Sequence, residues 1–121
     1  MSEPWRLIIG LGELLWDLLP SGKQLGGAPA NFGVMSARLG NHAVIASRAG
    51  ADALGEEARA YLAHLPVDLS DLQLDADHAT GSVSVTLKDG QPEYVIHQPV
   101  AWDFLEFTPN WQELAEQADA V

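Results

Sequence analysis

The 121-residue chain contains no cysteine. It therefore forms neither a disulfide framework nor a thiolate metal site. Its histidines do not fall at the spacings of metal ligands either, so the sequence predicts no metal site of its own. We expect all four to face solvent or to lie on loops: His42, His64, His78 and His97.

Basic residues are scarce, with six against seventeen acidic ones and a net charge of -11. Nucleic-acid binding needs a basic stripe that neutralises phosphates. The six basic side chains are scattered along the chain and form no such stripe. The sequence therefore argues against nucleic acid as a partner.

Long apolar runs are lacking too, since no stretch approaches the roughly 20 residues that span a bilayer. The stretch from Met1 to Trp5 has neither the basic start nor the apolar core of a secretory signal. We therefore expect no membrane partner and a cytoplasmic location. With 47% hydrophobic and 19% charged residues, the composition is that of one globular domain.

The first two thirds of the chain alternate between strand and helix patterns. Near-continuous apolar runs over residues 6–11 and 42–49 predict strands buried in a parallel sheet. Helical spacing predicts helices over residues 29–39 and 53–65, the second ended by Pro66, with a short strand over residues 67–69. This order predicts a parallel α/β fold with right-handed crossovers.

A different pattern follows, in which Ser82, Ser84 and Thr86 alternate with apolar residues. This alternation predicts a half-exposed antiparallel strand, and the turn at residues 89–90 returns the chain into a second strand over residues 93–97. We interpret this hairpin as a flap on the edge of the α/β body. Its edge strands could pair with a second copy of the chain, because unpaired strand edges invite such pairing.

The chain closes on a predicted helix over residues 111–118 and stops at Val121, where another strand is expected to begin. A compact domain seldom finishes in this way. We therefore expect this sequence to be one part of a longer protein.

Two glycine segments fail as nucleotide motifs. Gly10 and Gly12 follow a strand, but Leu15 stands where a dinucleotide fingerprint needs a third glycine. The pair Gly22-Lys23 lacks the other residues of a phosphate-binding loop. Residues 50–52 are better explained as a turn with Asp52 as a helix cap.

The segment Gly-Gly-Ala-Pro-Ala-Asn over residues 26–31 is more informative. Gly26 and Gly27 permit close approach of a ligand to the backbone and can act as a hinge. Asn31 would lie in the first turn of the following helix, where its amide can both donate to and accept from hydroxyl groups. From spacing alone, a simple Gly-Gly turn followed by a surface asparagine explains the segment slightly better.

Several segments together resemble the N-terminal signature of the ribokinase-like (PfkB family) carbohydrate kinases. They occur in the family's order and cover nearly the whole chain. The opening Gly-Glu-Leu-Leu-Trp-Asp and the Gly-Gly-Ala-Pro-Ala-Asn segment are most similar to fructokinase-like members. The matching segments are residues 10–17, 26–31, 37–40, 49–55, 80–81, 89–90 and 101–103.

The resemblance implies an α/β sandwich with a small β-sheet lid, here formed by about residues 14–28 and 80–98. It also implies an enzyme that phosphorylates a sugar hydroxyl with ATP and Mg²⁺. Asp17 matches the acid that holds sugar hydroxyls, Gly26 and Gly27 match the lid hinge, and Asn31 matches an asparagine that contacts the sugar. A carboxylate can accept hydrogen bonds from two adjacent hydroxyls, which agrees with the role of Asp17.

The family's glycine-rich, aspartate-ending catalytic motif, Gly-x-Gly-Asp, does not occur in the sequence. We therefore expect the catalytic base and the ATP site outside these residues, and no sugar phosphorylation by this piece alone. Two alternatives stay open on the sequence. One is a non-catalytic sugar-binding or interaction module of the same fold, and the other is a nucleoside kinase of the same family.

Overall fold

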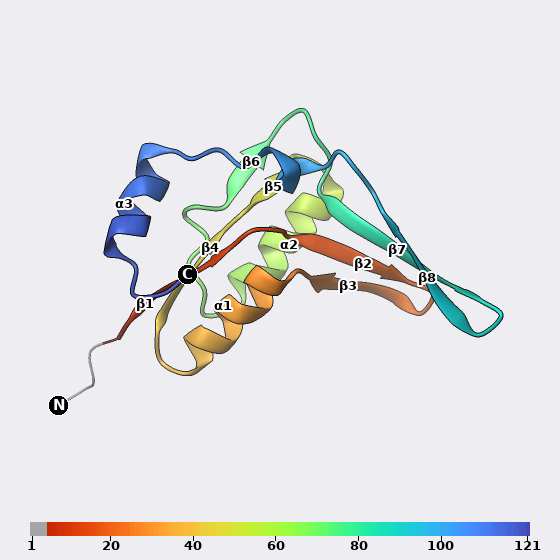
Figure 1. The fold of residues 1–121 in the computed structure, drawn as a ribbon, viewed down its shortest axis with the longest axis horizontal. Coiled ribbons are helices and arrows are strands. Elements are labelled where there is room, and N and C mark those ends of the chain that lie inside the picture. Colours follow the sequence, from red (N-terminus) through yellow and green to blue (C-terminus); the bar gives the residue numbers. More distant parts are fainter. Residues whose placement is uncertain (1–4) are drawn as a thin grey trace.

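The computed structural model describes residues 5–121, so most of the stretch tested for a targeting signal, Met1 to Trp5, lies outside the described residues. Figure 1 shows an α/β body, with a separate sheet extending from one end of it. Within residues 5–121 no helix has both the length and the apolar character needed to cross a membrane.

The body is built on parallel strands. β1 (Leu7–Leu11) pairs with β4 (His42–Ala46), and β5 (Arg48–Gly50) pairs with β6 (Gln73–Asp75). On the other side of β1, the Ile9 N–H donates to the Ala120 carbonyl at 3.0 Å, which places the end of the chain beside this strand. The predicted parallel α/β layering is confirmed.

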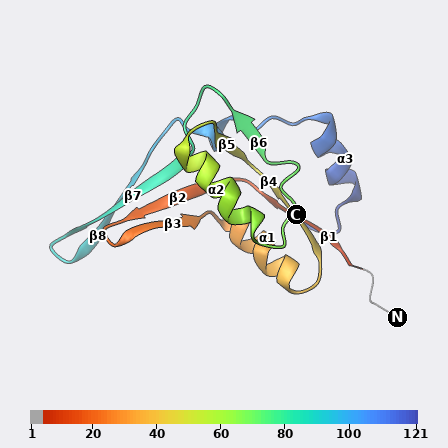
Figure 2. The same cartoon turned by 180° about the vertical axis from the view of Figure 1, so that it is seen from behind.

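Helices cover both faces of this sheet. Side chains alternate along a strand, so Gly10 and Ile45 face α1 (Ala28–Arg38), where a side chain on Gly33 would meet the Ile45 Cδ1 at 2.3 Å. Ile9 and Ala46 face the opposite way and pack against Trp111 of α3 (Pro109–Gln117). Viewed from behind, α1 and α2 (Ala53–Ala63) lie in front of the body strands (Figure 2).

The separate sheet has four strands in the order β3-β2-β7-β8. β2 (Leu15–Leu19) and β3 (Gly22–Gly26) form one hairpin, and β7 (Gly81–Lys88) and β8 (Gln91–Ile96) form the other. The two hairpins join where β2 runs parallel to β7. At the tip of the second hairpin, Asp89 and Gly90 have positive φ angles of 52° and 76°, as a two-residue turn requires.

The structure differs from two of the predicted strands and adds elements that the sequence pattern did not predict. The predicted continuous strand over residues 42–49 is wrong, because the chain breaks at Ser47, whose hydroxyl turns to bond the Gly12 carbonyl. The predicted strand over residues 67–69 is also wrong, since only Asp68 pairs with Val44. The sequence pattern did not predict four elements: β2, β3, β6 and the short 3-10 helix η1 (Ala101–Phe104).

Candidate functional site

A cavity of about 390 Å³ lies against the separate sheet, near its junction with the body. Strand alternation puts Leu15 and Asp17 of β2 on the same face as Val83 of β7, and cross-strand pairing adds Ile96 of β8 to that face. The lining residues are Glu13, Leu15, Asp17, Gly27, Val83, Tyr94, Ile96, Gln98 and Trp102.

Asp17 is half-buried in the middle of β2, between its partners Gln24 of β3 and Val83 of β7. Its carboxylate lies over the next strand at Gly26, where an added Cβ would meet the Asp17 Oδ2 at 2.7 Å. A larger residue at position 26 would therefore displace the carboxylate. This contact gives Gly26 a role in positioning Asp17.

Gly27 connects β3 to α1 and has a φ of 102°, a backbone conformation that favours glycine. An added Cβ would lie 2.7 Å from the carbonyl oxygen of Glu13. The chain leaving β3 thus passes directly over the segment entering β2. Gly27 also lines the cavity.

Asn31 has a different position. It is exposed in the first turn of α1, where its N–H donates to the Gly27 carbonyl at 3.3 Å, and it is not among the cavity-lining residues. The structure therefore brings Asp17, Gly26 and Gly27 together but leaves Asn31 outside the cavity. Its contact with a sugar stays a prediction.

The chemical lining of the cavity is asymmetric. Glu13 and Asp17 contribute the acidic character, while Leu15, Val83 and Ile96 are apolar. Within residues 5–121, no lysine or arginine lines the cavity. The arrangement suits a neutral ligand that donates hydrogen bonds from hydroxyl groups on one side and offers apolar surface on the other.

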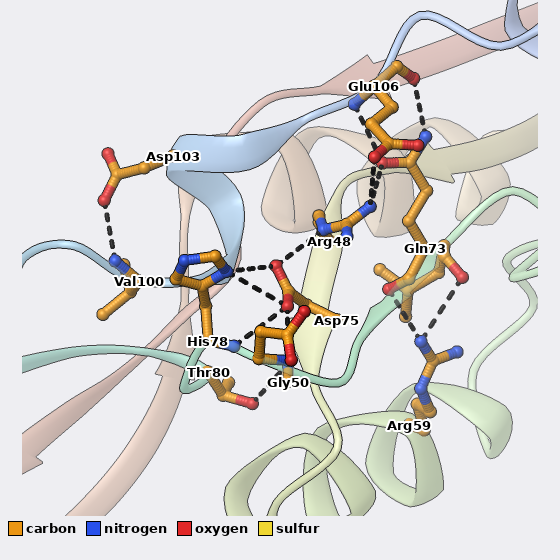
Figure 3. Close-up of polar contacts among 12 residues, drawn as sticks. Arg48, Gly50, Arg59, Gln73, Asp75, His78, Thr80, Val100, Asp103 and Glu106 are labelled. Atoms are coloured by element: carbon orange, nitrogen blue, oxygen red, sulfur yellow. Dashed lines mark hydrogen bonds and ion pairs between the residues drawn. The ribbon is translucent and has the colours of Figure 1, made fainter.

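A buried network fixes the loop that leads into β7 (Figure 3). Its centre is Asp75, which is 1% exposed and accepts from Arg48 Nε at 2.8 Å. The same carboxylate accepts the backbone N–H groups of Asp77 and His78 and approaches the His78 Nδ1 at 3.0 Å. The Arg48 hydrogen bond, helped by those of Asp77 and His78, holds the pKa of Asp75 well below its usual range. Asp75 therefore stays charged at physiological pH.

A second network joins α2 to the start of β7. Asp52 caps α2 by accepting the Gly55 N–H at 2.9 Å, which confirms the predicted helix cap. The same carboxylate accepts the Thr80 hydroxyl at 2.6 Å, and the Thr80 Oγ1 accepts the Gly50 N–H at 2.9 Å. These hydrogen bonds hold Thr80, the residue before β7, against the body.

Seven of the nine lining residues were not predicted as site residues from the sequence: Glu13, Leu15, Val83, Tyr94, Ile96, Gln98 and Trp102. Trp102 carried a signal, because it stands in the family-like segment Ala-Trp-Asp. Glu13 and Leu15 also carried a signal, because they stand in the family-like segment over residues 10–17. Val83, Tyr94 and Ile96 reach the cavity only through the pairing of β2 with β7 and of β7 with β8.

The described residues do not form a site for Mg²⁺. Among residues 5–121, no group of three or more His, Asp or Glu side chains is arranged to hold a metal ion.

Comparison with known proteins gives consistent results. The family model described as pfkB family carbohydrate kinase matches residues 21–121. A sugar kinase from Pyrococcus horikoshii is 32% identical over the whole chain, which covers 43% of that relative. A fructokinase from Salmonella typhimurium is 42% identical over 65% of the chain, which covers 27% of that relative.

Solved structures show the same fold. A fructokinase from Vibrio cholerae superposes with a TM-score of 0.78 at 32% identity, covering 85% of this chain and 38% of that one. The Pyrococcus horikoshii kinase, solved in complex with ATP, superposes with a TM-score of 0.76 at 32% identity, covering 93% of this chain and 40% of that one. This chain thus spans less than half the length of each of these proteins.

Proposed function

Because the chain belongs to the pfkB family of carbohydrate kinases, we propose that it supplies the sugar-binding part of an enzyme that phosphorylates a sugar hydroxyl with ATP. The observation that carries this proposal is the cavity on the separate sheet, with Asp17 in its wall. The four-stranded sheet, formed by the segments about residues 14–28 and 80–98, would be the lid over the sugar.

In this proposal Asp17 accepts hydrogen bonds from sugar hydroxyls, Gly26 and Gly27 form the hinge that leaves room for its carboxylate, and Asn31 contacts the sugar when the lid closes. Hydrogen bonds to a charged carboxylate contribute about 1.5 to 3 kcal/mol each, enough to orient a small ligand. ATP would supply the phosphoryl group and Mg²⁺ would neutralise its charge, both held by residues outside the described ones.

The substrate we propose is an uncharged sugar, with fructose or a related hexose first. Glu13 and Asp17 place two carboxylates at the cavity. A carboxylate of the cavity and an anionic group of a ligand about 4 Å away would repel each other by about 4 kcal/mol near a protein surface. A sugar phosphate or a sugar acid would therefore be disfavoured unless a cation from elsewhere in the protein offsets this repulsion.

We expect the full-length protein to phosphorylate free hexoses with a kcat/KM at least about tenfold higher than for the corresponding sugar phosphates or sugar acids. A coupled ADP-release assay over a panel of free sugars, phosphorylated sugars, sugar acids and nucleosides measures this preference. Glu13→Gln should reduce the difference in kcat/KM between free and phosphorylated sugars, because it removes one of the two carboxylates. Turnover of nucleosides alone would favour a nucleoside kinase, and no turnover of any compound would favour a non-catalytic module.

We also propose that the lid strands mediate a homodimer. β8 is an edge of its sheet within the described residues, and its side chains Tyr94, Val95 and Ile96 are exposed. Placing a lysine on an edge strand disfavours strand pairing between copies. Val95→Lys should therefore shift the sedimentation coefficient to that of a monomer, whereas the control Leu74→Lys, at an exposed position of β6, should leave it unchanged. A monomeric wild type at micromolar concentration would contradict the proposal.

A further inference from the structure

Trp102 occupies a distinctive position at the cavity. It is half-buried in η1 and lines the cavity directly. Its indole rests on Gly81, where an added Cβ would lie 2.7 Å from Cδ1 and 3.0 Å from Nε1. The missing side chain at Gly81 thus creates the space that the indole fills.

The strand register sets the spacing between this indole and Asp17. Gly81 pairs with Leu15, and Val83 pairs with Asp17, so the two positions lie two residues apart along neighbouring strands on one face. Two residues of strand span about 6.6 Å. Asp17 and Trp102 therefore face the same cavity from neighbouring positions, close enough for one small ligand to contact both.

The indole N–H of Trp102 is available to a ligand. Trp16 Nε1 donates to the Leu54 carbonyl at 2.9 Å, and Trp111 Nε1 donates to the Asp71 carbonyl at 3.1 Å. Trp102 makes no comparable bond within residues 5–121, and no buried side-chain nitrogen or oxygen there lacks a partner. Its Nε1 is therefore accessible.

The backbone that carries Trp102 is held by the loop that leads into β7 and by hydrogen bonds within η1. The Ala101 N–H donates to the Ala79 carbonyl at 2.7 Å, and the Val100 N–H donates to the Asp103 Oδ2 at 2.9 Å (Figure 3). One residue further on, Phe104 stacks on His78 with ring centroids 3.7 Å apart and an interplanar angle of 17°. Trp102 is thus positioned before any ligand arrives, which lowers the entropic cost of binding.

We propose that Trp102 is a sugar-binding and specificity-determining residue, whose indole packs against the C–H face of the sugar while its Nε1–H donates to a hydroxyl. This inference rests on the proposed function of the site. Sugars have apolar C–H faces between their hydroxyl edges, and aromatic side chains combine a large apolar surface with a polar handle. The residue thus selects sugars that present an unbroken C–H face opposite the hydroxyls held by Asp17.

The test compares Trp102→Ala and Trp102→Phe in the full-length protein, with Trp5→Phe as a matched control because Trp5 is 61% exposed and does not line the cavity. Trp102→Ala should raise the KM for the preferred sugar by roughly tenfold and leave the KM for ATP unchanged. Trp102→Phe should recover most of this loss, because the ring is kept. Adding sugar without ATP should change the tryptophan fluorescence of wild type and Trp5→Phe but not of Trp102→Phe.

An unchanged sugar KM in Trp102→Ala, or a full fluorescence response in Trp102→Phe, would overturn the inference while leaving the kinase proposal intact. A wild type that neither binds nor phosphorylates any sugar would overturn both. Since Trp102→Phe conserves the packing on Gly81, its fluorescence result stands even if Trp102→Ala proves unstable.

Discussion

Replacing Asp17 by Asn should lower kcat/KM for the sugar by roughly thirty- to a thousandfold and leave the KM for ATP nearly unchanged. The variant keeps the shape of the side chain but loses the charge that strengthens its hydrogen bonds to hydroxyls, at a cost of about 2 to 4 kcal/mol. Steady-state kinetics with sugar and ATP varied separately measures the effect. Because Asp17 is half-buried in the cavity wall, this is the largest catalytic effect we expect from one lining residue.

The matched control is Glu116→Gln, which removes one acidic charge from exposed α3, away from the cavity. It should leave both kinetic constants unchanged. If Asp17 merely shaped β2, Asp17→Asn would lower the melting temperature and reduce the use of sugar and ATP in proportion. A stable Asp17→Asn enzyme with normal sugar kinetics would remove this residue from the proposed site.

A large loss of stability is expected from Gly27→Ala. An alanine at a φ of 102° costs about 1 to 2 kcal/mol in backbone strain. Its Cβ would also lie 2.7 Å from the Glu13 carbonyl oxygen, and such overpacking typically costs a further 1 to 3 kcal/mol or so. Chemical denaturation should therefore show the free energy of unfolding reduced by about 2 to 5 kcal/mol.

Gly40→Ala separates the two contributions. Gly40 has a φ of 97°, close to that of Gly27, but no atom lies within 4 Å of an added Cβ. Gly40→Ala should therefore lower the free energy of unfolding only by the cost of backbone strain. Equal losses in the two variants would show that the contact with Glu13 relaxes without cost and that Gly27 needs glycine for its φ alone.

The sequence predicted those parts of the fold that depend on local pattern. The alternation around Ser82 and Ser84 and the turn at Asp89 predicted the β7–β8 hairpin, which the structure confirms. Helical spacing predicted α1 and α2 to within two residues at either end. Each of these signals comes from residues that are close together in the sequence.

What the sequence could not predict depends on non-local pairing. β3 consists largely of polar and glycine residues, so nothing in its sequence indicates that it would pair with β2. Tyr94 and Ile96 reach the cavity only because β7 lies beside β2. Asp17 was singled out without any knowledge of its partners, because residues 10–17 resemble the family's opening segment.

The β2–β7 seam has a mechanical consequence. Each hairpin is a two-stranded ribbon, which is marginally stable at best in water. Only four residue pairs, from Leu15–Gly81 to Leu18–Ser84, join the two ribbons into one plate. A bending load on the tip at Gly90 passes along β7 and β8 to the Thr80 and Ala101 contacts at their base, and the seam shares this load with the first hairpin. The resistance of the four-stranded sheet to bending is therefore set by the contacts at its end next to the body, and less by the hairpins themselves.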